Sequence, residues 1–323
     1  MRNWRKPRFF AVIMLLAAVL CEAPARSAES WPQRTVKFVV PLGPASGADL
    51  TARLLADPLS RQWGQAVIVE NRPGVDGMVG VTAFIAAADD HAVLFAPTGT
   101  FTASPLLHQD VAYKPDRLAP IARVTNTLIA IAVPSSMQVF SLGELMALVK
   151  NEPGRTHWAS TTGATDMVFS GFLKGAGLSM IRVPYRDGVR ATSDLSEGRI
   201  EVYMSALATM LPLASAGRIR ILALTNRERA AVVAEIPTVD EAGFPGLQYD
   251  GLVGMFGTAA MPVELRERIA ADVRAALADP AIVAKIAATG QVVNPGGPAA
   301  FAAAIAEQSA AFNAIATALG LQP

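Results

Sequence analysis

Short apolar runs with strand character alternate with amphipathic stretches along almost the whole chain. The strand-like runs cover residues 36–40, 66–70, 91–96, 128–133, 157–160, 181–184, 200–204, 219–224 and 252–256. The stretches with helical spacing cover residues 49–63, 77–87, 141–150, 166–176, 189–196, 209–216, 262–278, 280–288 and 298–319. This alternation predicts an α/β fold whose sheets are parallel and carry helices on both faces.

The length of 323 residues and the helical tail after the last strand-like run predict two α/β lobes. We expect lobe 1 to comprise residues 31–125 together with 226–323, and lobe 2 to comprise residues 126–225. Ligands of open α/β sheets bind beyond the carboxyl ends of the strands, where loops from different strands converge. Every polar loop that directly follows a strand is therefore a candidate part of a site.

The first 25 residues have the order of a secretory signal peptide. Four basic residues precede an apolar run over residues 9–20, and Ala23-Pro24-Ala25 follows, with cleavage expected after Ala25. A membrane anchor is the alternative, but the apolar run is shorter than the roughly 20 residues that span a bilayer. Lipidation at Cys21 is a second alternative, and Leu20 stands where such a motif has a small residue.

Removal of this segment takes away four of the 28 basic residues and one of the 27 acidic ones, so the formal charge changes from +1 to −2. No basic patch remains that would favour nucleic acid or an anionic membrane as a partner. Cys21 is the only cysteine, so the mature chain has no thiol for a disulfide, for catalysis or for a cysteine-based zinc site.

The loop after the first strand, residues 41–49, reads Pro-Leu-Gly-Pro-Ala-Ser-Gly-Ala-Asp. It lacks the lysine of a P-loop and the glycine spacing of a dinucleotide site, and around Ser46 it supplies only the centre of a nucleophile elbow. No two of the three histidines, His91, His108 and His157, have metal-ligand spacing. Structural or surface roles are therefore favoured for all three.

What this loop offers is its backbone. Gly43 and Gly47 give the chain freedom, and a helix begins near Asp49, so successive N–H groups can point at one anion. Two readings of Ser46 remain open, a cap of the helix and a ligand contact. We expect Asp49 to stabilise the start of the helix.

Similar small and hydroxyl-bearing residues follow two later strands. They are Thr98, Gly99 and Thr100, and then Ser160, Thr162, Gly163 and Thr165. Three such loops at corresponding places predict a cleft for a small anion. Tyr185 and Arg186 follow a fourth strand, and here also two readings remain open: contact with the ligand, or a packed tyrosine and a surface arginine beside Asp187.

Several phrases in this order resemble the Bug receptors, the solute-binding proteins of tripartite tricarboxylate transporters. The landmarks are Glu-Asn-Arg-Pro-Gly at 70–74 with Gly77 and Gly80, Val-Pro-Tyr at 183–185, Gly-Arg-Ile-Arg at 217–220, Ile-Pro-Thr-Val at 236–239, Glu-Ala-Gly-Phe-Pro-Gly at 241–246, and Ala-Asp-Pro at 278–280. The resemblance runs from Trp31 to about Gly320.

This resemblance implies a type II periplasmic-binding-protein fold, with two lobes joined by crossover strands and a carboxylated solute enclosed between them. It implies a periplasmic monomer without cofactor that delivers a small organic acid to membrane permease subunits. The ligand-binding candidates are Leu42, Gly43, Ala45, Ser46, Gly47, Thr98, Gly99, Thr100, Ser160, Thr162, Gly163, Thr165, Tyr185 and Ser205.

The chain departs from the pattern of the family at several of these positions. Leu42 replaces an aromatic residue, Ala45 and Ser46 replace glycines, and Thr162 stands where a glycine is usual. Ser205 occupies the place of an aspartate that suits a ligand ammonium group. We therefore predict a mono- or dicarboxylate ligand without an amino group.

Two other functions are compatible with such a fold. The receptor could present its closed form to a two-component sensor in place of a permease. A periplasmic hydrolase is the third candidate, and the lack of a serine, histidine and acid constellation in the sequence argues against it.

Overall fold

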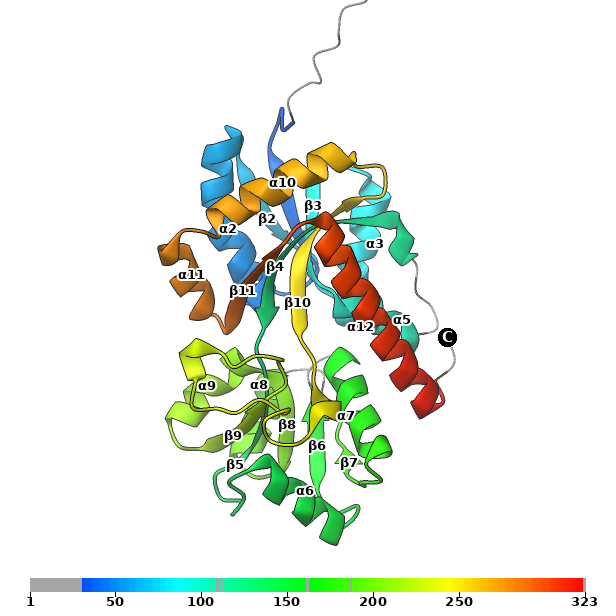
Figure 1. Ribbon diagram of the computed structural model, residues 1–323, viewed down its shortest axis with the longest axis vertical. Helices are drawn as coiled ribbons and strands as arrows, with labels where there is room; N and C mark the ends of the chain where they lie inside the picture. Colours follow the sequence, from blue (N-terminus) through cyan, green and yellow to red (C-terminus); the bar gives the residue numbers. More distant parts are fainter. Residues whose placement is uncertain (1–30, 109–110, 112, 161–162, 186–187, 322–323) are drawn as a thin grey trace, which may run out of the picture. The chain divides into compact units, whose positions relative to one another are not determined.

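The computed structural model describes residues 31–108, 111, 113–160, 163–185 and 188–321 (Figure 1). The described residues from Arg34 onward form one compact unit. The predicted signal peptide, residues 1–25, and the candidates Thr162 and Arg186 lie outside the described residues. No helix in the described part of the chain combines the length and the apolar character needed to cross a membrane.

Six strands form the first sheet, in the order β11-β4-β10-β3-β1-β2. Their bounds are β1 Val36–Val40, β2 Val67–Asn71, β3 Ala92–Pro97, β4 Leu118–Thr127, β10 Gly251–Thr258 and β11 Gln291–Gly296. The strands β1, β2 and β3 are parallel to one another. Strand β10 lies between β3 and β4 and is antiparallel to both, and β11 is antiparallel to β4.

Helices cover both faces of this sheet. They are α2 Gly47–Trp63, α3 Met78–Ala87, α10 Val263–Ala276, α11 Pro280–Ala287 and α12 Pro298–Leu319, with short turns α4 Gly99–Thr102, α5 Ser104–Leu107, η1 Val75–Gly77 and η2 Pro115–Arg117. Side chains alternate between the faces of a strand. Phe38 of β1 therefore packs against Trp63 of α2, whereas its neighbour Val39 joins a core that contains Phe301 of α12.

Five strands form the second sheet, in the order β7-β6-β8-β5-β9. Their bounds are β5 Ile129–Pro134, β6 His157–Ser160, β7 Ile181–Arg182, β8 Val202–Ala206 and β9 Ile219–Leu224. The accompanying helices are α6 Leu142–Asn151, α7 Gly163–Gly175, α8 Gly188–Ser196 and α9 Leu207–Ser215, with turns η3 Ala231–Val233 and η4 Pro245–Leu247. Strand β6 is parallel to β7 and β8, whereas β5 is antiparallel to β8 and β9.

One buried side chain ties together the two places where the chain passes between the sheets. Asn226 follows β9, is 4% exposed, and accepts a hydrogen bond from Ile129 N–H at 3.1 Å. Its Nδ2 donates to the Thr127 carbonyl at 3.0 Å and to Asp250 Oδ1 at 3.2 Å. Each crossover segment is thus bonded to the same amide, and we call this arrangement the crossover node.

The predicted α/β fold with two sheets is confirmed, but the prediction that the sheets are parallel is wrong for several strands. Strands β5 and β10 are the first strands after the two passages between the sheets, and both run antiparallel to their neighbours. Each enters its sheet from the other sheet, without the helical crossover that places successive strands of one sheet parallel. Strands β4 and β11 were not predicted at all, and the two-lobe boundaries stay a prediction.

Candidate functional site

A cavity of ≈ 560 Å³ is lined by residues from loops of both sheets, and we call it the cleft cavity. Asp76 and His108 come from the six-stranded side, and Ser160, Gly163 and Tyr185 come from the five-stranded side. The last three are predicted site residues. Gly163 lies close to both sides of the cavity, because a Cβ there would stand 2.5 Å from Leu107 Cδ1 and 3.3 Å from Asp76 Oδ2.

The first loop is built around Asp49, which is 1% exposed at the start of α2. Its carboxylate accepts hydrogen bonds from Ala45 N–H at 2.8 Å, Arg53 Nε at 3.0 Å and Asn71 Nδ2 at 2.9 Å. Burial opposes ionisation, and these donors outweigh it and hold the pKa of Asp49 below its usual range. The expectation that Asp49 stabilises the helix start is confirmed.

Ser46 is the N-cap of α2, because its Oγ accepts from Asp49 N–H at 3.3 Å. Ala45 before it has a left-handed backbone with φ 63°, in a position where the related pattern has glycine. The Leu42 carbonyl accepts from Asn71 Nδ2 at 3.1 Å, and the Gly43 carbonyl accepts from Ser46 N–H at 3.3 Å. None of these described residues lines the cleft cavity.

Gly47 is needed because Gln291 lies against it. A Cβ on Gly47 would stand 2.1 Å from Gln291 Nε2. Gln291 is 1% exposed, its Oε1 accepts from Thr125 at 3.0 Å and Thr127 at 3.2 Å, and its Nε2 donates to Thr127 Oγ1 at 3.0 Å. Sequence reasoning missed Gln291, because strand β11 itself was not predicted.

The second loop is buried inside the structure. Thr98 is 0% exposed, and its hydroxyl donates to Gln308 Oε1 of α12 at 2.5 Å and to the Leu252 carbonyl at 3.3 Å. Thr100 is 4% exposed, and its carbonyl accepts from Tyr113. Gly99 lies between these two residues and against α7, since a Cβ there would stand 3.0 Å from the Cβ of Ala164. The structure therefore brings this loop to the five-stranded side without exposing its hydroxyls in the cleft cavity.

Asp76 was not predicted, although the backbone around it is unusual. Val75 and Asp76 have φ values of 43° and 53°, and Gly74 and Gly77 beside them also have positive φ. A β-branched residue in the left-handed region is a genuine outlier, and such strain gathers at functional sites. Asp76 Oδ2 lies 3.2 Å from His108 Nε2. The pair of glycines around Val75 and Asp76 was the signal in the sequence.

A second charged pair lies on the five-stranded side of the cleft cavity. Arg182, whose side chain is 53% exposed, donates from Nε to Asp166 Oδ2 at 2.5 Å, and Ser170 donates to Asp166 Oδ1 at 3.3 Å. Arg182 was not predicted, and a resemblance centred on the Val-Pro-Tyr phrase directly after it gave no reason to select it. Thr165, a predicted site residue, is 2% exposed and does not line the cavity.

Tyr185 lines the cavity with its hydroxyl already engaged. The hydroxyl donates to Asp194 Oδ2 at 2.7 Å, and Asp194 also pairs with Arg199. Burial and this hydrogen bond raise the pKa of Tyr185 to about 12. Ser205, by contrast, is 1% exposed on β8, with Thr209 Oγ1 3.5 Å from its hydroxyl, and it is not part of the lining.

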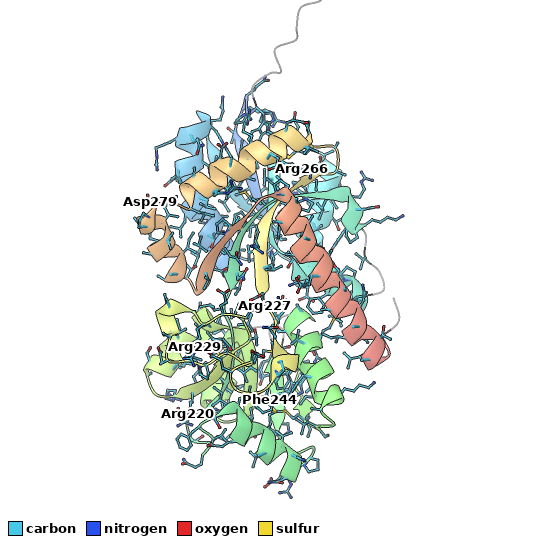
Figure 2. The ribbon with its side chains drawn as sticks, viewed as in Figure 1. Arg220, Arg227, Arg229, Phe244, Arg266 and Asp279 are labelled. Carbon is cyan, nitrogen blue, oxygen red and sulfur yellow. The ribbon has the colours of Figure 1, made fainter. Side chains whose placement is uncertain are left out.

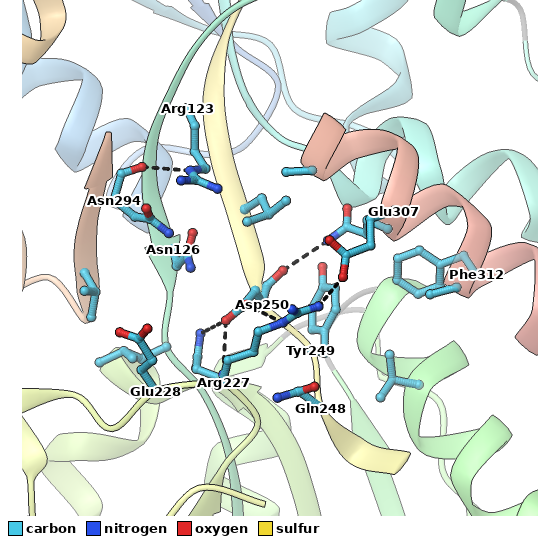
Figure 3. Close-up of a pocket in the computed structure, with 18 of the residues that line it drawn as sticks. Arg123, Asn126, Arg227, Glu228, Gln248, Tyr249, Asp250, Asn294, Glu307 and Phe312 are labelled. Carbon is cyan, nitrogen blue, oxygen red and sulfur yellow. Dashed lines mark hydrogen bonds and ion pairs between the residues drawn. The ribbon is translucent and has the colours of Figure 1, made fainter. Parts of the chain in front are cut away.

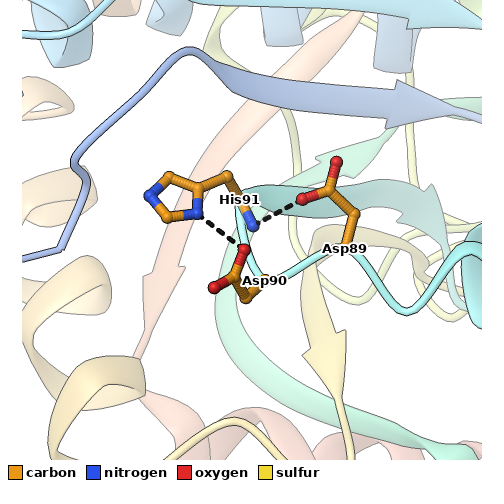
Figure 4. A group of neighbouring side chains, drawn as sticks. All are labelled: Asp89, Asp90 and His91. Atoms are coloured by element: carbon orange, nitrogen blue, oxygen red, sulfur yellow. Dashed lines mark hydrogen bonds and ion pairs between the residues drawn. The ribbon is translucent and has the colours of Figure 1, made fainter.

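Asp89, Asp90 and His91 form a cluster whose ligand atoms lie within 4.8 Å of one another (Figure 4). Arg34 donates to Asp89 at 2.7 Å and to Asp90 at 2.6 Å. Asp89 also accepts the His91 N–H at 2.9 Å, and Lys37 lies 3.7 Å from it. These partners compensate the carboxylates, so we assign no metal to this cluster.

Two α/β sheets joined by short crossovers, with a cavity lined by strand-end loops of both, define the class of two-lobed solute-binding receptors. The comparisons with known proteins agree. The chain matches the family described as tripartite tricarboxylate transporter family receptor over residues 51–321, and it belongs to this family. The family consists of transporter receptors, so the prediction that the chain is not an enzyme is confirmed.

A UPF0065 protein of Bordetella bronchiseptica is 29% identical over 314 residues, which cover 96% of this chain and 93% of that protein. A solved structure of Rpa4515 of R. palustris with adipate is 26% identical, covers 91% of this chain and 99% of that one, and superposes with a TM-score of 0.81. The periplasmic binding protein BugD, at 24% identity, covers 90% and 99% with a TM-score of 0.76 and supports the fold.

Proposed function

We propose that this chain is a periplasmic receptor that encloses a small carboxylic acid in the cleft cavity and delivers it to the permease subunits of a tripartite tricarboxylate transporter. The observation that carries the proposal is a cavity lined by strand-end loops of both sheets, in a chain 26% identical to a protein whose structure contains adipate. A ligand that contacts both sides favours the conformation in which they approach, and a permease can recognise that conformation.

The cavity volume of ≈ 560 Å³ lies within the range of about 300–1,000 Å³ that is usual for small-molecule sites. Arg182 is its most exposed cationic group. Its Nε and Nη2 face Asp166 Oδ2, so a ligand carboxylate would accept from the Nη1 side of the planar guanidinium. Ser160 contributes a hydroxyl from the end of β6. We assign the ligand carboxylate to this side of the cavity.

The charge pattern supports a ligand without an amino group. Asp76 and Asp166 are the carboxylates among the described lining residues, and each has a basic partner, His108 or Arg182. Neither is left to compensate a ligand ammonium group, whose burial without a partner is costly. Ser205, in the place of the family aspartate, supplies no carboxylate either.

The test is a thermal-shift screen of the mature protein against dicarboxylates of four to eight carbons, followed by titration calorimetry. A ligand at 100 times its Kd adds about 2.7 kcal/mol to the free energy of unfolding. Arg182→Gln should weaken binding by about tenfold or more, since hydrogen bonds to charged groups contribute about 1.5–3 kcal/mol. Arg155→Gln is the matched control, because Arg155 pairs with Glu152 on the surface and does not line the cavity.

Equal loss of affinity in both variants, or no stabilisation by any acid, would contradict the proposed site. Glutarate and glutamate test the ligand class, because they differ only in the amino group. Tighter binding of glutamate would refute the proposal of an amine-free acid.

The proposal includes export through a signal peptide cleaved after Ala25, a monomeric receptor, and lobe boundaries near residues 125 and 225. The six-stranded sheet draws on residues 36–127 and 251–296 and the five-stranded sheet on 129–224, which supports these boundaries. Intact mass of the exported protein and its light-scattering mass in solution test the first two statements. Retention of the loaded receptor on the isolated permease subunits would favour delivery to a transporter over presentation to a sensor.

A further inference from the structure

A second cavity, of ≈ 420 Å³, lies beside the crossover node, and its described lining residues are all different from those of the cleft cavity (Figure 3). We call it the crossover cavity. It is lined by β4, by the segment that follows β9, by the segment that leads into β10, by β11 and by one side of α12. None of the predicted site residues that the structure describes lines it, so binding of a ligand there would not depend on the proposed function of the cleft cavity.

The acidic groups at the centre of the crossover cavity are already compensated. Arg227, which lies beside β10 (Figure 2), pairs with Glu307 of α12 and lies 3.6 Å from Asp250 Oδ2. Asp250 Oδ1 also accepts a hydrogen bond from Asn226 at 3.2 Å. These groups are bonded to one another and therefore supply structure to the cavity, with one guanidinium set between two carboxylates.

Arg123 is different, because no carboxylate lies within ion-pair distance of it among the described residues. Its Nε donates to the Asn294 carbonyl at 2.9 Å, which fixes the direction of the guanidinium and leaves its other N–H groups available. Figure 3 shows Arg123, Asn126 and Asn294 gathered at one end of the cavity, away from the exposed Glu228.

A strand irregularity places Arg123 and Asn126 on the same side. Residues three apart in a regular strand face opposite sides. Here Thr125 pairs with Val253 and Arg123 pairs with Gly254, so Val124 is an extra residue opposite β10. The pairing with β11 also shifts between these two positions, from Val293 to Gly296. Such bulges are common beside binding sites, where they re-aim a side chain.

Asn126 brings an acceptor that has no donor among the described residues. Its Oδ1 is buried and has no hydrogen-bond partner there. An unsatisfied buried acceptor costs free energy, and a ligand hydroxyl in the cavity would satisfy it. Apolar side chains such as Leu252, Val293 and Phe312 line the rest of the cavity.

We propose that the crossover cavity is a second binding site, for a small 2-hydroxycarboxylic acid with an apolar body. The Arg123 guanidinium receives the carboxylate, the 2-hydroxyl donates to Asn126 Oδ1, and the body packs on the apolar wall. The carboxylate and the hydroxyl are carried by adjacent carbons in such an acid, which suits a donor and an acceptor on the same side of one strand.

The test compares mandelate with phenylacetate, which have the same phenyl body and differ in the hydroxyl, by calorimetry and ligand-observed NMR on the whole mature protein. We expect mandelate to bind about tenfold more tightly, the value of about one hydrogen bond. Asn126→Leu should reduce mandelate affinity to that of phenylacetate and keep the fold, because it removes a buried unsatisfied atom. Arg123→Met should weaken both acids by about tenfold or more.

Arg182→Met in the cleft cavity is the control that separates the two sites. Mandelate binding that survives Arg182→Met and is lost in Asn126→Leu supports the proposal. Mandelate binding that is lost in Arg182→Met, or equal affinity for the two acids, overturns it. The dicarboxylate screen tests only the cleft cavity with Arg182. If it fails, the comparison of mandelate binding in the variants of the crossover cavity can still be interpreted.

Discussion

Gly47→Ala is the substitution whose effect the structure specifies most closely. The new methyl group would stand 2.1 Å from Gln291 Nε2 and 3.1 Å from its Cδ, so the buried amide has to move. Movement breaks the three hydrogen bonds that join Gln291 to Thr125 and Thr127.

The magnitude follows from these three bonds. Each contributes about 1 kcal/mol net, and alanine returns about 0.5–1 kcal/mol through its helix preference at the first position of α2. The free energy of unfolding should therefore fall by about 2–2.5 kcal/mol. Because 1 kcal/mol corresponds to about 2 °C in a chain of this size, Tm should fall by about 5 °C.

Gly43→Ala is the matched control, since it is the same chemical change in the same loop. A Cβ on Gly43 meets no described atom within 4 Å, so its effect should stay within about 0.5 kcal/mol. Denaturant unfolding of both variants, with and without Gln291→Ala, provides the assay. In the Gln291→Ala background, Gly47→Ala should cost nothing further. Equal losses at Gly43 and Gly47, or a full loss at Gly47 in both backgrounds, would refute the reasoning.

Three further substitutions give separate readouts. Asp49→Asn should lower the free energy of unfolding by about 2 kcal/mol above pH ~4. Because the pKa of Asp49 is depressed in the folded protein, the difference in stability from wild type should shrink as pH falls through that pKa. Urea unfolding between pH ~3 and ~7 measures this difference. The neutral phenol of Tyr185 contributes stability that is complete below pH ~10 and is lost as pH rises toward its pKa of about 12. The free energy of unfolding of Tyr185→Phe, measured between pH ~9 and ~11.5, should therefore fall less with rising pH than that of the wild type. Gly163→Ala places a methyl group against the flexible end of Leu107, so the free energy of unfolding should change by less than about 0.5 kcal/mol. Calorimetry should show weaker binding of the acid, because the methyl group enters the cleft cavity. Unchanged affinity would argue against the cleft cavity as the site.

The elements with clean periodicity were predictable from the sequence. Helix α12 was predicted with its bounds, and β1 and β6 likewise, because proline, buried apolar runs and flanking turns mark their ends. Strand β4 was not predictable in this way, since Pro120, Arg123 and Asn126 interrupt its alternation. Those side chains fit because a bulge and a cavity receive them, and neither is visible in a linear pattern.

The candidate site was predictable only where a loop exposes its side chains. Ser160, Gly163 and Tyr185 line the cleft cavity, whereas Thr98 and Ser46 use their hydroxyls for internal bonds. A hydroxyl in a strand-end loop signals a local need for a donor or acceptor, and a sequence does not distinguish a helix cap from a ligand contact. Asp76 and Arg182 enter the cavity through tertiary pairing with His108 and Asp166, which has no local signature.

The strand order β11-β4-β10-β3-β1-β2 also governs when the protein can fold. Among the described strands, β4 has hydrogen-bonded neighbours only in β10 and β11, which begin at Gly251 and Gln291. When the chain has been made only as far as Thr127, this ten-residue strand lacks both neighbours, and the six-stranded sheet cannot close until the last quarter of the chain arrives. Its long-range pairing makes folding slow and late, so a nascent or partly transferred chain remains open along this strand.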